Sequence, residues 1–278
     1  MARTSSSAAT ANPPPAGAKG PAVRLAGLYH SYGSVTALNG IAQKVEAGSF
    51  VALVGLSGSG KSTLLKTVNR LVAPDSGQVL IDGIDNCESD LHRLRRSIGY
   101  VFQNIGLFPH MDVARNIGIG AWIRNIAPLG EARIAELLEQ VDLPASIALR
   151  MPGELSGGQQ QRVGVARALA HEPGLMLMDE PFGALDPITR ELIGNTYRAI
   201  HDRLGLTTLM VTHDMAEALL LADRIWVMAD GRIVADATPQ QLLLGACGAE
   251  AEALVAIPRA QAEKLVAMRE RATADRLA

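Results

Sequence analysis

The stretch Gly55-Leu56-Ser57-Gly58-Ser59-Gly60-Lys61-Ser62 decides the fold of this chain. It follows the apolar run Phe50–Val54, which is typical of a buried strand, and it precedes apolar residues at helical spacing. Glycines let such a loop wrap closely around phosphate oxygens, and the start of the next helix adds the positive end of its dipole. Lys61 is placed to reach the β- and γ-phosphates, and the Ser62 hydroxyl to bind magnesium. An ordinary glycine-rich turn lacks this strand–loop–helix setting, so the sequence predicts a site for a magnesium-bound nucleoside triphosphate.

The composition is that of a globular α/β protein: 48% of the 278 residues are hydrophobic. A formal net charge of −2 gives no general attraction to nucleic acid, and we expect none to bind. The only cysteines, Cys87 and Cys247, are far apart and outside any metal-ligand spacing, which predicts free thiols in a reducing compartment. No run is apolar and long enough to cross a bilayer, and residues 1–21 lack the apolar centre of a secretory signal. We therefore expect a cytoplasmic protein with a disordered tail over residues 1–21.

The strand and helix patterns point to an α/β fold. Two loosely alternating runs, Val23–Tyr29 and Val35–Val45, predict an antiparallel subdomain before the loop. Further strands are expected at Val79–Ile81, Ile98–Phe102, Leu175–Met178, Thr208–Val211, Ile225–Met228 and Ile233–Ala235. Helical periodicity covers Pro187–Arg203, Met215–Leu221 and Pro239–Leu244, so the core is predicted to be a mostly parallel sheet with helices on both faces.

The pattern between Phe108 and Ala170 is helical throughout, which predicts an inserted helical subdomain over about residues 108–170. The last stretch is rich in Ala, Glu, Arg and Leu, with Pro258 dividing two expected helices. We therefore predict one nucleotide-binding domain over residues 22–245, followed by a short helical extension over residues 246–278.

A second element of a phosphate site follows the apolar run Leu175–Met178, which ends in Asp179 and Glu180. The strand is expected to carry both carboxylates to the edge of the sheet beside the loop. Asp179 is placed to hold magnesium through its water shell, and Glu180 to orient or deprotonate an attacking water. The sequence therefore predicts hydrolysis as well as binding.

A third element, Leu155-Ser156-Gly157-Gly158-Gln159, begins an Ala- and Val-rich helix. Ser156 is placed as its N-cap, which leaves free N–H groups at the helix start. Together with the two elements above, this run resembles the ATPase subunits of ABC transporters, and the resemblance extends from about Val23 to Leu244. It implies a P-loop NTPase fold of the ABC-ATPase type. It also implies a head-to-tail dimer, in which Ser156, Gly157 and Gly158 grip the γ-phosphate of ATP held by a second copy.

The resemblance also assigns roles to single residues. It implies that Tyr32 stacks on adenine, that Gln103 touches magnesium and the attacking water, and that His213 contacts the γ-phosphate. Asp186 falls in the loop that crosses the dimer interface. The implied nucleotide-binding set is Tyr32, Gly55, Leu56, Ser57, Gly58, Ser59, Gly60, Lys61, Ser62, Thr63, Ser156, Gly157, Gly158, Gln159 and Asp186. The implied magnesium set is Ser62, Gln103 and Asp179, and the implied catalytic set is Lys61, Gln103, Glu180 and His213.

The run Glu180–Arg190 resembles importer ATPases, and its ending Pro187-Ile188-Thr189-Arg190 is similar to systems that take up quaternary amines. Such systems import osmoprotectants: glycine betaine, choline, proline betaine or carnitine. The resemblance implies two membrane permease subunits, an indirect solute-binding partner, and a place on the inner face of the cell membrane. Because the ATPase does not touch the solute, the solute is inferred by analogy alone.

Four alternatives stay open at this stage. They are an importer ATPase for another small solute such as an amino acid, an exporter ATPase, a soluble ABC protein serving translation or DNA repair, and a module that binds ATP without turnover. One local departure bears on the partner. Asp112 and Arg115 stand where many relatives carry Thr and Glu, beside the surface expected to meet the permease.

Overall fold

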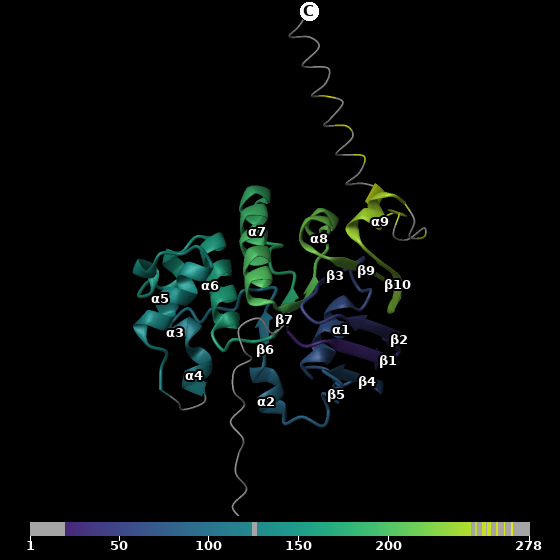
Figure 1. Ribbon diagram of the computed structural model, residues 1–278, viewed down its shortest axis with the longest axis horizontal. Helices are drawn as coiled ribbons and strands as arrows, with labels where there is room; N and C mark the ends of the chain where they lie inside the picture. Colours follow the sequence, from purple (N-terminus) through teal and green to yellow (C-terminus); the bar gives the residue numbers. More distant parts are fainter. Residues whose placement is uncertain are drawn as a thin grey trace, which may run out of the picture.

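The computed structural model describes residues 20–123 and 127–245, and in addition positions 248, 252–253, 255–256, 260, 264 and 268. The predicted tail, apart from its last two residues, and most of the predicted C-terminal extension therefore lie outside the described residues. Within the described part, two sheets and a group of helices lie side by side (Figure 1). The domain boundaries proposed from the sequence stay predictions.

A six-stranded sheet forms the centre of the molecule, with the strand order β10-β9-β3-β8-β7-β6. Every neighbouring pair is parallel except β9 and β10, which are antiparallel. This confirms the predicted mostly parallel sheet. The strands are β3 (Phe50–Val54), β6 (Ile98–Val101), β7 (Leu175–Asp179), β8 (Thr207–Val211), β9 (Arg224–Ala229) and β10 (Arg232–Ala237).

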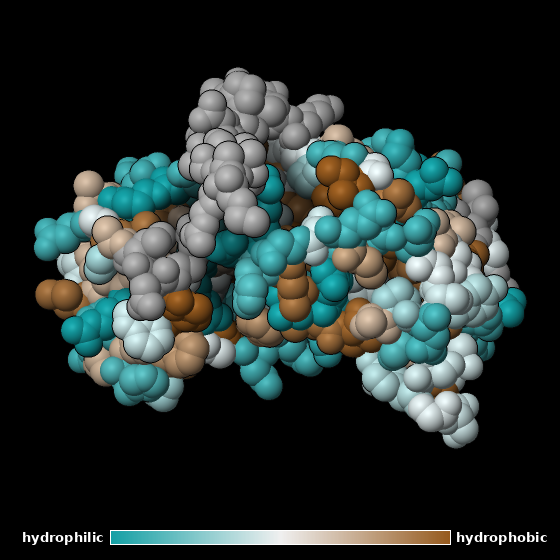
Figure 2. All heavy atoms as spheres, turned by 90° about the horizontal axis from the view of Figure 1, so that it is seen from below, coloured by the Kyte–Doolittle hydropathy of each residue, from teal (hydrophilic) through white to brown (hydrophobic). Residues whose placement is uncertain are grey.

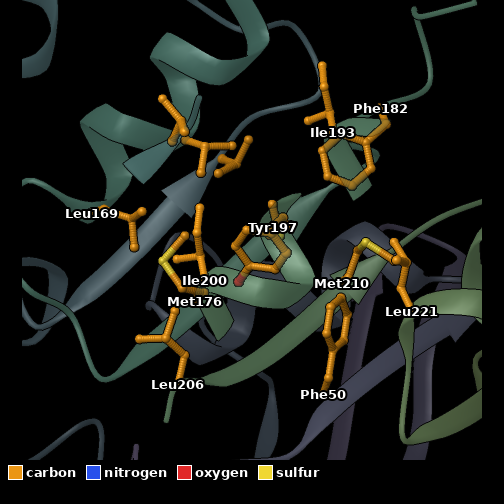
Figure 3. Close-up of a cluster of buried hydrophobic side chains, with 14 of the residues drawn as sticks. Phe50, Leu169, Met176, Phe182, Ile193, Tyr197, Ile200, Leu206, Met210 and Leu221 are labelled. Carbon is orange, nitrogen blue, oxygen red and sulfur yellow. The ribbon is translucent and has the colours of Figure 1, made fainter. Parts of the chain in front are cut away.

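Strands β3, β7 and β8 of the central sheet are buried on both faces, and their successive side chains point to opposite sides of the sheet. In β3, Phe50, Ala52 and Val54 belong to one hydrophobic core, whereas Val51 and Leu53 belong to the other. The first core is closed by three helices, α6 (Gly157–Leu169), α7 (Pro187–Leu204) and α8 (Met215–Leu221). Figure 3 shows Phe50, Met176 and Met210 of the strands facing Tyr197, Ile200 and Leu221 of α7 and α8.

The second core lies between the central sheet, helix α1 (Lys61–Val68) and a four-stranded antiparallel sheet. Leu64, Leu65 and Val68 of α1 are fully buried there. Helices thus cover both faces of the central sheet, as predicted, and the antiparallel subdomain is confirmed. Its strand order is β2-β1-β4-β5, with β1 (Val23–Tyr32), β2 (Val35–Val45), β4 (Ser76–Ile81) and β5 (Ile84–Asp85).

The described residues between β6 and β7 form helices and no strand, and they make the lobe at the left of Figure 1. This confirms the inserted helical subdomain as a feature of the fold. Its elements before α6 are α3 (Val113–Ile117), α4 (Ile119–Ile123), α5 (Glu131–Gln140), η1 (Ala145–Ile147) and η2 (Pro152–Glu154). The remaining helices of the described chain are α2 (Leu91–Arg96) and α9 (Pro239–Leu243).

The surface is mixed in character. On the face shown in Figure 2, hydrophobic residues appear as separate spots among hydrophilic ones. In the described part of the chain, none of the helices combines the length and the apolar character needed to span a lipid bilayer.

Candidate functional site

The loop between β3 and α1 requires glycine at two positions. Gly55 and Gly60 have φ angles of 151° and 101°. A Cβ atom at Gly55 would lie 2.1 Å from the carbonyl oxygen of Met228, and one at Gly60 would lie 2.1 Å from that of Ala37. Any side chain at either position would therefore clash with neighbouring backbone. The tight curve of the loop follows from these two residues.

Lys61 lies inside this curve and is 6% exposed. Its ammonium group donates hydrogen bonds to the carbonyl oxygens of Gly55 (2.8 Å) and Leu56 (2.7 Å). Burial lowers the pKa of Lys61, while the carboxylates of Glu180 and Asp179 act in the opposite direction. The side chain is thus a buried cation held by the loop itself and facing two acids.

The rest of the loop lies around this cation. The side chain of Ser59 is buried, whereas Leu56, Ser57 and Gly58 form an exposed rim. Thr63 follows in the first turn of α1 and is half-buried. Among the described residues, no side chain caps the start of α1, so its first N–H groups stay open to an anion.

Asp179 at the end of β7 meets the helix that follows the loop. The Ser62 hydroxyl donates a 2.8 Å hydrogen bond to Oδ1 of Asp179. The two residues are far apart in the chain, and the parallel strands bring them together at one edge of the sheet. A hydroxyl beside a carboxylate offers the oxygen donors that magnesium prefers.

Glu180 contacts two polar side chains that follow the neighbouring strands. Gln103, after β6, donates from Nε2 to Oε2 of Glu180 at 3.0 Å. Nδ1 of His213, after β8, lies 3.3 Å from the same oxygen. The backbone of Glu180 has a φ of 46°, and its N–H donates to the carbonyl of Val211 at 2.9 Å. The structure therefore brings the four predicted catalytic residues, Lys61, Gln103, Glu180 and His213, to one end of the sheet.

The loop that carries Gln103 is fixed to helix α6. Arg167 of α6 donates to the carbonyl oxygens of Gly106 (2.7 Å) and Ile105 (2.6 Å). Burial lowers the pKa of Arg167. This contact, which the sequence reasoning missed, ties the position of Gln103 to the helix that starts at Gly157.

Ser156, Gly157, Gly158 and Gln159 form a second, separate group at the start of α6. Oγ of Ser156 accepts from the N–H of Gln159 (3.3 Å), and the Ser156 N–H donates to Oε1 of Gln159 (3.0 Å). These two bonds form a capping box, with Ser156 as the N-cap that the sequence predicts. The neighbours of the two glycines are on or next to α7: Leu185, Thr189 and Ile193.

Asp186 lies near this second group and caps α7 by accepting from the N–H of Thr189 at 3.0 Å. Hydrogen bonds from Thr189 hold the pKa of Asp186 below its usual range. Among the described residues, no hydrogen bond joins Ser156, Gln159 or Asp186 to the loop around Lys61. The structure therefore brings the predicted site residues together as two groups rather than one.

Tyr32 lies at the tip of the hairpin formed by β1 and β2, where it pairs with Val35. Its side chain is 54% exposed, and its ring packs edge-to-face against His30 at 4.6 Å between centroids. An exposed aromatic face can stack on a base. Its role in binding adenine stays a prediction.

The departure at Asp112 has a local explanation. Asp112 is the N-cap of α3 and accepts from the N–H of Arg115 at 2.7 Å. Thr and Asp are both good N-caps, so either residue at this position can cap α3.

Sequence reasoning also missed a polar group beside His213. It consists of Arg190 on α7 together with Thr212, Asp214 and Glu217 around the start of α8. Glu217 is 8% exposed, and burial raises its pKa to about 7. The one signal in the sequence is Asp214, which stands in an N-cap position before the predicted helix Met215–Leu221.

The comparisons with known proteins agree with this geometry. A family model described as ABC transporter matches residues 38–183. The glycine betaine/carnitine/choline transport ATP-binding protein of Bacillus subtilis is 48% identical over 212 residues, which are 76% of this chain and 56% of that protein. The Fe(3+) ions import ATP-binding protein of Pseudomonas fluorescens is 46% identical over 223 residues, covering 80% of this chain and 62% of that one.

The chain spans little more than half the length of the first of these curated relatives. Among solved structures, a dimeric bacterial ABC transporter cassette superposes with a TM-score of 0.70 at 33% identity. That match covers 78% of this chain and 98% of the cassette. Nearly the whole cassette thus has its counterpart in this chain.

Proposed function

Since the chain belongs to the ABC transporter family, we propose that it is an ATP-binding subunit that hydrolyses ATP to drive solute uptake through a separate membrane permease. The observation that carries the proposal is the Glu180 carboxylate, which contacts Gln103 and His213 beside the Asp179–Ser62 pair. In this proposal Glu180 is the base, Gln103 and His213 are its polar neighbours, and Asp179 and Ser62 are the oxygen pair for magnesium. A module that binds ATP without hydrolysing it has no need for such a base.

Each group has a chemical task in this proposal. The loop N–H groups and Lys61 bind the phosphates of ATP. Ser62 and Asp179 fit magnesium because their oxygens already lie side by side, and Gln103 is a further candidate ligand. Bound magnesium would neutralise charge on the phosphates. Glu180 orients the attacking water and takes its proton, while His213 holds the carboxylate from the side of β8.

The second group completes the site from another copy. We propose a head-to-tail dimer, in which Ser156, Gly157 and Gly158 of one chain face the nucleotide on the loop of the other. Two facts support it: these residues have no hydrogen bond to their own loop among the described residues, and the bacterial cassette named above was solved as a dimer. Closure then depends on contacts that exist only with nucleotide bound.

The proposed solute is a quaternary amine of the glycine betaine, choline or carnitine class. The Bacillus relative and the run Pro187–Arg190 support it. Ferric ion is the competing solute, because the Pseudomonas relative is almost as similar. The subunit would bind the permease at the inner face of the membrane, and the permease would receive solute from a solute-binding protein.

Replacing Glu180 by Gln tests hydrolysis. We expect turnover of ATP to fall by about 10²- to 10⁴-fold while nucleotide binding is kept, because the amide cannot accept the proton from water. Glu172→Gln is a matched control: Glu172 also has a positive φ (53°), but it pairs with Arg133 away from the site. Turnover of Glu180→Gln at the wild-type rate would refute the proposed base.

Uptake measurements test the solute. The chain would be produced with its candidate permease and solute-binding protein in a bacterial strain that lacks its own uptake systems. Labelled glycine betaine, choline, carnitine and ferric ion would be compared, with the Glu180→Gln chain as the inactive control. We expect uptake of the quaternary amines only, and copurification of the chain with the permease. Uptake of ferric ion alone would assign the chain to the competing class.

A further inference from the structure

Arg190 connects two loops that the proposed function uses for different tasks. It lies one turn into α7, the helix that begins directly after the interface loop Ala184–Asp186. Its Nη1 donates to Oδ2 of Asp214 at 2.5 Å, and its Nη2 donates to the carbonyl oxygen of Leu185 at 3.0 Å. The side chains of Arg190 and Asp214 are 23% and 28% exposed, so water weakens this ion pair only in part.

Asp214, the carboxylate that Arg190 binds, is itself fixed to the turn that carries His213. Oδ1 of Asp214 accepts from the N–H groups of Ala216 (2.9 Å) and Glu217 (3.3 Å) and so caps α8. The Asp214 N–H donates to Oγ1 of Thr212 at 3.0 Å, and this hydroxyl donates to Oε2 of Glu217. Both neighbours of His213 are thus held by hydrogen bonds, while the His213 ring contacts Glu180.

We propose that Arg190 is a positioning residue that links the interface loop Ala184–Asp186 to His213. The inference rests on the proposed function, because it uses the roles assigned there to His213 and to the interface loop. When a second copy docks on that loop, a shift of Leu185 is passed through the guanidinium to Asp214 and to the adjacent imidazole. His213 already contacts Glu180 in the single chain, and docking of the partner then adjusts the position of its ring against that carboxylate.

The chemistry of arginine suits this link. Its guanidinium is planar and rigid, and it offers donors in two fixed directions at once. One arm of Arg190 binds a charged carboxylate and the other a neutral carbonyl, so the two loops are held at a fixed separation. A lysine has a single charged end on a flexible stem and cannot hold both partners in the same geometry.

Arg198 provides a control on the same helix. It lies eight residues further along α7 and also binds a carbonyl and a carboxylate: Nη1 donates to the carbonyl of Leu221 and to Oδ1 of Asp223, both at 2.8 Å, and Nε and Nη2 bind Asp202. Its side chain is 29% exposed, close to the value for Arg190. Within the described part of the chain, no hydrogen bond or ion pair joins Arg198 to either loop, so Arg198→Ala measures the effect of losing an arginine with a purely structural role.

Steady-state kinetics give the first test, on the full chain with the permease if that is needed for turnover. We expect Arg190→Ala to lower kcat for ATP by roughly 100-fold with little change in KM, because a small misplacement of a catalytic group costs that much. Arg190→Lys should recover only part of the loss. Arg198→Ala should lose similar thermal stability but keep kcat. Equal losses of kcat in the two alanine variants would overturn the proposal.

A double-mutant cycle shows whether Arg190 acts through His213. In a His213→Ala background, Arg190→Ala should change kcat by less than about twofold, because its only route to the reaction has been removed. If the loss of kcat in the double variant equals the product of the losses in the two single variants, Arg190 acts by another route and the assignment is overturned.

Histidine NMR gives a test that does not depend on turnover. The chain has six histidines, and the ring signals of His213 are those missing from His213→Ala. Arg190→Ala should shift these signals, whereas Arg198→Ala should leave them in place. Unchanged His213 signals in Arg190→Ala would overturn the link even if the chain hydrolyses ATP. If the wild-type chain hydrolyses no ATP, the proposed function fails while this measurement still decides the role of Arg190.

Discussion

The phosphate-loop end of the molecule and the start of α6 are built in opposite ways. At the loop, side chains from α1 and from three strand ends contact one another: Ser62 with Asp179, and Glu180 with Gln103 and His213. At α6, Ser156 is bonded only within its own helix start. The first group is nearly complete inside one chain, and the second presents helix N–H groups outward. This difference is the one that the proposed head-to-tail dimer needs, in which the second group of one copy faces the first group of the other.

The largest effect is expected at the loop, where Lys61→Ala breaks the first group. The Lys61 ammonium is the one cation inside the described loop, and each charged hydrogen bond to phosphate contributes on the order of 2 kcal/mol. We expect the affinity for ATP to fall by about 100-fold, measured by binding of a fluorescent nucleotide. Lys44→Ala is the control, because Lys44 is exposed and pairs only with Glu46. Unchanged affinity in Lys61→Ala would place the phosphates elsewhere.

A smaller effect concerns Glu217, which accepts a hydrogen bond from Thr212, the residue before His213. Its pKa is raised from 4.5 to about 7 by burial, with Asp214 adding to the rise and Thr212, Arg190 and His213 acting against it. The folded chain therefore binds the extra proton between these values, and the free energy of unfolding falls as the pH rises from about 4.5 to about 7. Glu217→Gln keeps the contact with Thr212 and removes the charge.

We expect Glu217→Gln to be more stable than wild type by about 1–3 kcal/mol at pH 8 and equal to it below pH 4.5. Denaturant unfolding across this pH range measures the difference. A difference that does not change with pH would contradict the buried position of this carboxylate.

The smallest effect separates the two glycines of the second group. A Cβ at Gly158 would lie 2.7 Å from Cγ2 of Thr189, whereas one at Gly157 would have no neighbour closer than 3.9 Å. Gly158→Ala should therefore destabilise the chain by about 1 kcal/mol, and Gly157→Ala should not. Thermal unfolding of the two variants checks this. Equal stability would mean that α6 and α7 can move apart without cost.

Much of the fold follows from local pattern. Met215–Leu221 matches α8 residue for residue, and Phe50–Val54 is the fully buried strand that its composition indicates. The phosphate loop and the two acids after β7 are predictable because their chemistry needs fixed spacing. The short strand β5 was missed, since two residues carry no periodicity, and Phe102 was placed in a strand that ends at Val101.

The finer parts of the site depend on contacts that no local pattern contains. Arg190 and Asp214 are 24 residues apart and meet because α7 packs against α8. The positive φ of Glu180 likewise depends on its hydrogen bond to Val211 in the next strand. Spacing and the family resemblance name the residues of the site, but long-range packing decides how their side chains are oriented.

The central claim is that the two groups complete each other between copies, and the most direct test is the mass of the Glu180→Gln chain in ATP. Light scattering should give twice the 29.4 kDa of one chain with ATP and a single chain without it. Adding Gly157→Asp should abolish pairing but not ATP binding, because a charge there favours the helix start yet repels phosphate. Pairing that survives Gly157→Asp, or a Glu180→Gln chain that binds ATP and stays single, would contradict the account.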